Sequence, residues 1–161
     1  MNIKIKYFEG ATKLQKIDKG SWIDVYARED VFIPLHLDSK VPLGFAMELP
    51  ENYEALLNVR SSTSDKWGVI LLNELGVIDT SFNGDSDEWR MSLRCIKATC
   101  EQECTWNGKS IMIPGTLIKA GDKIGQFRIQ ECMPVINFVE VDHLGNPSRG
   151  GFGSTGPTKE F

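Results

Sequence analysis

Short strand-like segments separated by turn signals recur along almost all of this 161-residue chain, and they limit its fold more than any other feature. The segments are rich in β-branched and aromatic residues and are bounded by Pro, Gly or Asn-Gly. No stretch carries a long helical stripe, and the one expected helical turn covers 62–67. Strands are expected at 3–8, 23–27, 44–49, 55–59, 69–72, 89–98, 110–113, 124–131 and 135–141. Many short strands at this spacing predict an all-β sandwich, barrel or jelly roll.

Turn chemistry adds two local expectations. Asn-Gly pairs at 83–84 and 107–108 favour tight β-hairpins, because both residues tolerate positive φ. The segment 51–57 can be interpreted as a helix, but we expect a turn followed by a strand, since 59–62 must leave a rigid element if it holds a ligand.

An excess of acidic residues narrows the classes of partner. The formal net charge is −4, so the field of the whole protein repels polyanions and argues against general nucleic-acid binding. Any anion site must therefore be local, built from one or two arginines, backbone N–H groups and a divalent cation. The length predicts one domain. No membrane span or signal peptide is visible, so we expect a cytoplasmic protein without a membrane partner.

The four cysteines do not form a metal motif. Cys95, Cys100 and Cys104 have the spacing C-x4-C-x3-C, and Cys132 stands apart. Zinc sites usually show CxxC pairs and four ligands. In the cytosol a stable disulfide is not expected either. Free thiols, on a hairpin for the first three, are the better interpretation.

The C-terminus combines glycine with ligand-binding residue types. Segment 149–156 contains four glycines, Arg149, Phe152, Ser154 and Thr155. A flexible Gly-rich tail is one interpretation. A linker, however, does not need an arginine fork for phosphate and an aromatic face for a base at set positions. We therefore interpret the segment as an arm that closes over a phosphorylated ligand.

A second unit, Arg60-Ser61-Ser62, precedes the only expected helical turn. A serine N-cap leaves unpaired N–H groups that favour an anion, and an arginine adds charge-assisted bonds. The alternative is an ordinary cap beside a surface arginine.

A third unit lies in segment 76–84, where Asp79 ends a strand and Phe82 follows three residues later. A carboxylate at such a position can orient and deprotonate a water molecule. The alternative is a turn-stabilising Asp with a core Phe.

Two further segments carry weaker signals. Segment 121–126 begins with a Gly-Asp turn and ends in Gln126, whose amide N–H could bind phosphate. Asp24 lies among apolar residues in an expected strand, which is unusual unless it is paired or near a cation. An ordinary hairpin and a solvent-facing Asp are the alternatives.

Each unit is weak alone, but their order resembles the five motifs of the homotrimeric dUTP pyrophosphatase (dUTPase) family. The units in question are Asp24, 59–69, 73–84, 121–126 and 149–156. Segment 127–146 further resembles forms carried by phages of Gram-positive bacteria. The departures are Phe82 where many relatives have Tyr, Ser62 in place of a glycine, and Trp22-Ile23 before Asp24.

This resemblance implies a jelly-roll-like distorted β-barrel and a homotrimer that exchanges its C-terminal arm. It implies Mg²⁺-dependent hydrolysis of dUTP to dUMP and pyrophosphate, with Asp79 activating the water that attacks the α-phosphorus. Asp24 would orient metal-bound water. The implied substrate-binding residues are Arg60, Ser61, Ser62, Asn73, Gly76, Val77, Ile78, Phe82, Gly84, Gln126, Arg149, Phe152, Gly153, Ser154 and Thr155.

Residues 1–148 are then the β-domain and 149–161 the flexible arm. Segment 85–112 is longer than the family's usual hairpin, and we interpret it as a decorated loop, a protein-partner surface or an extended trimer contact. Two alternatives to the hydrolase stay open. One is a dCTP deaminase-like enzyme of the same fold, and the other is a phage-type dUTPase acting as a nucleotide-switched regulatory module that binds a protein.

Overall fold

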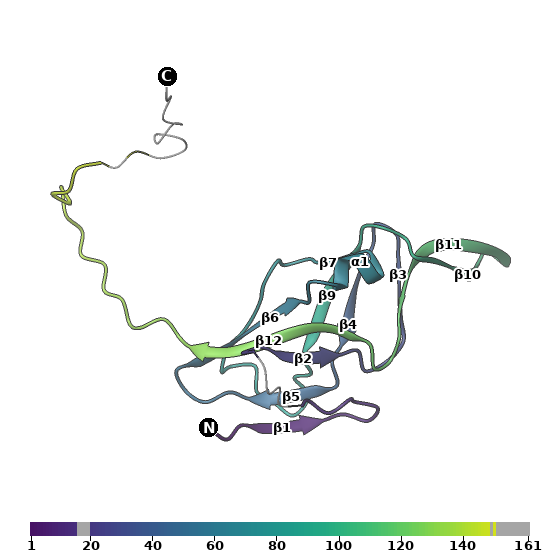
Figure 1. Cartoon of the computed structure of the whole chain (residues 1–161), viewed down its shortest axis with the longest axis horizontal. Coiled ribbons are helices and arrows are strands. Elements are labelled where there is room, and N and C mark those ends of the chain that lie inside the picture. The colour runs from purple at the N-terminus through teal and green to yellow at the C-terminus, as the bar shows by residue number, and fades with distance from the viewer. Residues whose placement is uncertain (16–19, 149, 151–161) are drawn as a thin grey trace.

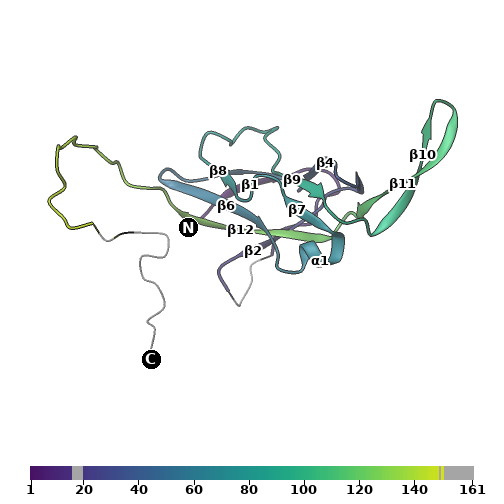
Figure 2. The same cartoon turned by 90° about the horizontal axis from the view of Figure 1, so that it is seen from above.

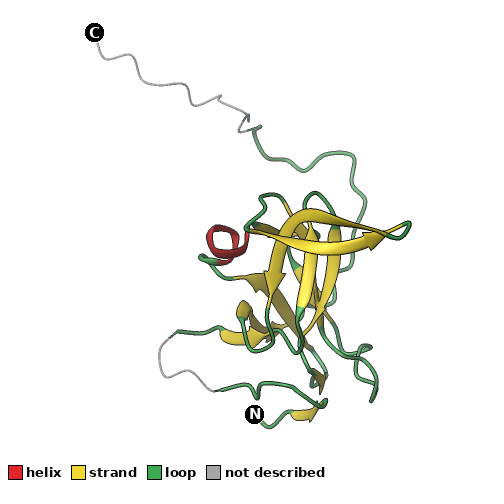
Figure 3. Ribbon diagram, turned by 90° about the vertical axis from the view of Figure 1, so that its right-hand side faces the viewer, coloured by secondary structure: helices red, strands yellow, loops and turns green. Residues whose placement is uncertain are grey.

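The computed structural model describes residues 1–15, 20–148 and 150, and within them the chain is almost entirely β, as expected (Figure 3). One short helix interrupts the strands. In chain order the elements are β1 (Lys4–Tyr7), β2 (Ile23–Tyr26), β3 (Val31–Pro34), β4 (Asp38–Pro42), β5 (Phe45–Glu48), β6 (Tyr53–Val59), α1 (Thr63–Trp67), β7 (Val69–Leu71), β8 (Gly76–Ile78), β9 (Arg90–Cys95), β10 (Cys100–Trp106), β11 (Lys109–Ile118) and β12 (Lys123–Glu131).

The named strands form four antiparallel sheets (Figure 1). Their orders are β1-β5, β10-β11-β3, β2-β12-β6-β8 and β4-β9-β7. In the four-stranded sheet, β6 pairs with β12 on one side and with β8 on the other. Every motif expected to carry chemistry, the C-terminal arm excepted, lies in this sheet or in a segment that leaves it.

Three aromatic rings hold the sheets together. Phe45 of β5, Trp89 before β9 and Phe127 of β12 are all almost completely buried. The Trp89 ring centroid lies 5.0 Å from that of Phe45 and 5.2 Å from that of Phe127. Tilted and edge-on aromatic contacts of this kind add to the stabilisation from apolar burial. The core therefore joins the segment before β9 to the sheet that bears β6.

Most of the expected strands are confirmed, and so is the helical turn at 62–67, where α1 forms. The turn before β6 is also present, with Asn52 at φ 63°. β3, β4 and β10 were missed. β10 joins β11 through Asn107-Gly108, with φ 48° and 74°, so this Asn-Gly pair does make the expected hairpin.

Two local expectations are wrong. No strand forms at 135–141, where Val135 and Phe138 are 94% and 95% exposed, because no sheet edge of the same chain lies beside them. Asn83-Gly84 makes no tight hairpin either. β8 pairs only with β6, while β9 pairs with β4 and β7, so a loop joins two different sheets there.

The structure divides the segment 85–112 into two parts. Its first part belongs to the core, since Trp89, Met91, Leu93 and Cys95 are buried. Its second part lies in the hairpin β10–β11, which projects from the body (Figure 2). Sequence length alone could not separate them, because β9 has the same alternation of apolar and polar residues as an exposed hairpin.

The cysteines are free thiols in the structure. Cys100 and Cys104 lie on the hairpin as expected, whereas Cys95 is buried in β9, and burial raises the pKa of its thiol. Among the described residues no helix is long and apolar enough to cross a membrane.

Gly68 provides a test of the fold. It ends α1 at φ 62°, and a Cβ there would overlap the backbone carbonyl of Lys97. Gly108 has a similar φ of 74° but open space around it. Gly108→Ala should therefore cost about 1 kcal/mol from backbone strain. Gly68→Ala should cost about 2–4 kcal/mol because overpacking adds about 1–3 kcal/mol.

Urea unfolding of both variants measures the difference. Equal losses of stability would show that Gly68 does not lie against the Lys97 carbonyl.

Candidate active site

Asp79 follows β8 directly and is exposed, with its carboxylate held by the next turn. One carboxylate oxygen, Oδ1, accepts hydrogen bonds from the Ser81 backbone N at 2.8 Å and from the Ser81 hydroxyl at 2.5 Å. These bonds, the hydroxyl's first, lower the pKa of Asp79 below its ordinary value. Since bonds to the charged form favour it, Asp79 is a carboxylate at neutral pH and can accept a proton.

Asp79 lies at a hollow of about 650 Å³. The hollow is large enough for a small organic ligand. Phe82 lines it with a ring that is 40% exposed, and Val77 and Ile78 of β8 line it as well. The structure thus places the carboxylate of Asp79 and the aromatic ring of Phe82 at the same hollow. The wall also includes two cations that no motif assigns, Lys40 and Arg90.

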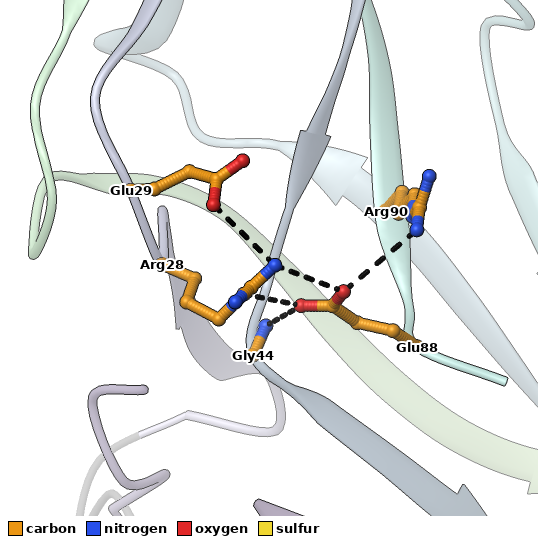
Figure 4. Close-up of polar contacts among 5 residues, drawn as sticks. All are labelled: Arg28, Glu29, Gly44, Glu88 and Arg90. Atoms are coloured by element: carbon orange, nitrogen blue, oxygen red, sulfur yellow. Dashed lines mark hydrogen bonds and ion pairs between the residues drawn. The ribbon is translucent and has the colours of Figure 1, made fainter. Parts of the chain in front are cut away.

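A buried carboxylate, Glu88, also lines the hollow and is held by several polar partners (Figure 4). Its Oε1 lies 2.8 Å from Arg28 Nε and accepts a hydrogen bond from Gly44 N at 2.9 Å. Arg90 Nη2 lies 3.9 Å from the other oxygen. A buried charge needs such partners. The loop between β8 and β9 is therefore held to the end of β2 and to the β4–β5 turn.

The remaining residues of this unit frame the same region. Asn73 donates its side-chain amide to Leu75 O at 3.3 Å, in the turn before β8. Gly76 pairs with Leu57, where a Cβ would lie 3.1 Å from the Leu57 Cβ. Gly84 N donates to Asp87 Oδ2 at 2.7 Å. These contacts set the shape of the loop around Asp79 and Phe82.

A second cluster lies where β2, β6 and β12 run side by side. Asp24 Oδ1 is 2.9 Å from Arg60 Nε, and Asp24 Oδ2 is 2.9 Å from Lys123 Nζ. Asp24 is thus paired, which accounts for its place among apolar neighbours. Gln126 lies opposite Asp24 in the β2–β12 ladder. The structure therefore brings together Asp24, Arg60 and Gln126 as expected.

Thr63 ties this cluster to the sheet. Its buried hydroxyl donates to Ile124 O at 3.0 Å and accepts from Arg60 N at 3.1 Å. Ser62 holds the N-cap position of α1, but its side chain makes no capping bond. The hydroxyls of Ser61 and Ser62 are in exposed residues, as a ligand contact requires.

The two clusters lie at opposite ends of β6. Asp79 comes after Ile78, which pairs with Ala55, whereas Arg60 comes directly after Val59. The five steps along the chain from Ala55 to Arg60 span roughly 17 Å of strand, at about 3.4 Å per residue. This separation exceeds the reach of an arginine side chain. One copy of the chain therefore does not aim Asp79 and Arg60 at the same phosphoryl group.

The described residues hold no ready-made metal site, since no three His, Cys, Asp or Glu side chains converge among them. Mg²⁺ in nucleotide enzymes commonly takes one or two carboxylates together with water and substrate phosphates. Asp24 fits that pattern as one contributor. Arg149, Phe152, Gly153, Ser154 and Thr155 lie outside the described residues.

Sequence reasoning missed Thr63, Ser81, Glu88 and Lys123. Lys123 lies inside the expected ligand-binding segment 121–126, and Thr63 is adjacent to Ser62, so their positions in the sequence could have indicated both residues. Glu88 offered none, because only its burial separates it from an ordinary surface glutamate.

Ser81→Ala tests the cause of the lowered pKa. The variant loses the hydroxyl bond and keeps the backbone one, so the pKa of Asp79 should rise toward its ordinary value. Carboxyl ¹³C NMR titration measures it, with Ser86→Ala in the same hollow as the control. An unchanged Asp79 pKa in Ser81→Ala would contradict the assigned hydrogen bond.

Known proteins resemble the chain over nearly its whole length, although no family model matches it. It is 46% identical over 157 residues to the SPbeta prophage-derived deoxyuridine 5'-triphosphate nucleotidohydrolase YosS of Bacillus subtilis, covering 97% of this chain and 99% of the relative. The deoxyuridine 5'-triphosphate nucleotidohydrolase of Gloeothece citriformis is 33% identical over 164 residues, with 99% and 100% covered.

Solved structures agree on the fold. The Staphylococcus bacteriophage 80alpha dUTPase with dUpNHpp has a TM-score of 0.75 at 19% identity, covering 96% of this chain and 98% of that one. A mutant dUTPase of the S. aureus phage phi11, whose structure describes a structural Mg(II) ion, has a TM-score of 0.70 at 18% identity, covering 89% and 99%. With a carboxylate beside an aromatic wall and relatives matched over nearly their whole length, the chain belongs to the deoxyuridine 5'-triphosphate nucleotidohydrolase (dUTPase) family.

Proposed function

We propose that this chain hydrolyses dUTP to dUMP and pyrophosphate. The observation that carries the proposal is Asp79, an ionised carboxylate held by Ser81 at a hollow that Phe82 also lines. Family membership supplies the substrate, since the relatives are named for deoxyuridine 5'-triphosphate.

Asp79 acts as the general base. It removes a proton from a water molecule whose oxygen bonds to the α-phosphorus, and the bond from that phosphorus to the bridging oxygen breaks as pyrophosphate leaves. A positioned base contributes about 10²–10⁴-fold to such a step. The low pKa that Ser81 imposes keeps Asp79 ready to accept the proton below neutral pH.

The hollow receives the nucleoside. Phe82 packs on the deoxyribose and leaves no room for a 2′-hydroxyl. The backbone of 76–78 and Gly84 reads the uracil, with Asn73 shaping the turn beside it. Gly76 keeps β8 close to β6, because a Cβ at that position would lie only 3.1 Å from the Leu57 Cβ.

The phosphates are bound by the cluster at the other end of β6, through Arg60, Ser61, Ser62 and Gln126. Because one copy holds Asp79 and Arg60 roughly 17 Å of strand apart, a complete site needs two copies. We therefore infer a homotrimer with its sites between subunits. Leu72, Leu75 and Val77, all well exposed beside β8, provide apolar surface for such contacts.

The segment after β12 supports an exchanged arm. It runs away from the body (Figure 1), and Val135, Phe138, Val139 and Leu144 are at least 80% exposed. Apolar side chains so exposed call for a partner. In the trimer this segment would cross to a neighbour, and 149–161 would close over the nucleotide through Arg149, Phe152 and 153–155.

The arrangement of the sheets as a jelly-roll barrel also stays a prediction.

Mg²⁺ is the proposed cofactor, with Asp24 as the carboxylate that orients its water. When bound with the triphosphate, the ion supplies charge neutralisation that a protein of net charge −4 lacks.

A second, protein-binding function has one observation in its favour. In the β10–β11 ladder, Trp106 shares one face of the hairpin with Cys104, Ile111 and Ile113, and Lys109 lies at its tip, while Glu101 and Glu103 lie on the other face. Trp106 is 69% exposed. The 80alpha dUTPase is described as controlling transfer of virulence genes.

A cytoplasmic location of the protein stays a prediction.

Asp79→Asn tests the hydrolase. Pyrophosphate release should be specific for dUTP among the deoxynucleoside triphosphates and should fall about 10²–10⁴-fold in the variant, while affinity for dUpNHpp is retained. Assays with and without Mg²⁺ test the cofactor. Ammonia release from dCTP without pyrophosphate release from dUTP would instead identify a deaminase.

Mixing two inactive variants tests the shared site. Asp79→Asn and Arg60→Gln damage opposite ends of β6, so subunit exchange between them should restore part of the turnover. Mixing Asp79→Asn with Asp79→Ala is the matched control and should restore none. No recovery in the first mixture, with exchange verified by mass spectrometry, would refute a site shared between copies.

A further inference from the structure

We propose that Lys123 is a further phosphate contact, and that Asp24 holds Lys123 and Arg60 as an internal counterion until nucleotide displaces it. The inference rests on the proposed function, because it names groups that would bind the triphosphate of the same substrate. None of the family motifs, as carried onto this chain, gives Lys123 a role.

The charges form a bridge of two cations on one anion. Both oxygens of Asp24 are occupied, one by Arg60 and one by Lys123, each at 2.9 Å. The Asp24 side chain is 17% exposed, whereas those of Arg60 and Lys123 are 36% and 39% exposed. The cations therefore reach solvent while the carboxylate between them is screened. The bridge carries one net positive charge in a protein of net charge −4.

A β-bulge places Lys123 beside the expected phosphate ligands. Lys123 pairs with Tyr26 and Gln126 pairs with Asp24, because the register shifts between Lys123 and Gly125. Directly paired residues share a face of an antiparallel sheet. Lys123 and Gln126, three positions apart in sequence, would otherwise face opposite sides. Bulges re-aim side chains in this way.

Neighbouring strands complete the same face. Asn58 of β6 pairs with Gln126, and Arg60 follows one residue after the end of β6. The Lys123 ammonium also lies 5.7 Å from the centre of the Tyr26 ring. Lys123 and Gln126 of β12 and Arg60 at the end of β6 thus present donors to one patch of surface, as a polyanion site requires.

Repulsion between the two cations explains why a carboxylate lies between them when no nucleotide is bound. Two cations this close repel each other, and a carboxylate between them holds both side chains in place. A triphosphate carries more negative charge than one carboxylate and can take over both cations. Asp24 is then free to orient metal-bound water.

This exchange predicts that substitutions of Lys123 and of Asp24 change the affinity for triphosphate in opposite directions. Lys123→Met removes a phosphate donor and should weaken triphosphate binding. Asp24→Asn removes the competitor and should strengthen triphosphate binding when Mg²⁺ is absent. A carboxylate that only positions a metal gives no such gain, so the sign of the Asp24→Asn effect separates the two roles.

The experiment is calorimetric titration of the full-length protein with dUpNHpp and with deoxyuridine, in low salt with EDTA. Lys123→Met should bind dUpNHpp about 10- to 100-fold more weakly, the range for a hydrogen bond to a charged group. Deoxyuridine affinity should be unchanged, and Lys123→Arg should recover most of the loss. Asp24→Asn should bind dUpNHpp several-fold more tightly.

Lys4→Met is the matched control, because it removes the same charge from an exposed ion pair with Glu48 on the β1–β5 pair. Its dUpNHpp affinity should equal that of the unaltered protein. Unchanged dUpNHpp affinity in Lys123→Met, or weaker binding in Asp24→Asn, would overturn the inference, whereas turnover of dUTP by the unaltered protein would still support the proposed function. An unaltered protein that neither turns over dUTP nor binds dUpNHpp would refute the proposed function as well.

Discussion

The pairing of β6 with a strand on each side is the constraint on which the rest of the structure depends. β12 lies along one edge of β6 and β8 along the other, both antiparallel and both in fixed register. That register decides which residues leave the sheet at each end. Asp79 lies beside the first residues of β6, and Arg60 lies just after its last residue. Slipping either ladder by one residue would turn every paired side chain to the opposite face.

The distance between Asp79 and the cations Arg60 and Lys123 follows from that ladder and shapes the proposed chemistry. A carboxylate and an arginine at opposite ends of one strand cannot serve one phosphorus atom within a copy. The exposed apolar residues beside β8 and after β12 indicate where other copies would make contact. In the proposed function, assembly of copies and catalysis depend on the same geometry. One copy alone has an incomplete site, and it also leaves apolar surface exposed that another copy would cover.

The two clusters also differ in how their charges are held. Asp79 is stabilised by neutral donors of Ser81 and keeps an oxygen free for a proton. Asp24 has both oxygens engaged by cations. Two aspartates in one sheet thus have different chemistry, and neighbours distant in sequence decide the difference for Asp24. The buried Glu88 shows a third case, in which ion pairs fasten a loop and leave nothing for a ligand.

The sequence by itself determined the all-β class, most strands, the turn of α1 and the placement of Asp79 at a strand end, because alternation, β-branching and turn residues are local properties. Only the tertiary structure decided that Asn83-Gly84 joins two sheets, that 135–141 lies without a strand partner and that 85–112 is half core and half hairpin. It also decided that Lys123 meets Asp24, through a bulge that no residue type announces. Pairing between strands distant in sequence sets these outcomes, and the free energy of such pairing depends on neighbours that a local pattern does not contain.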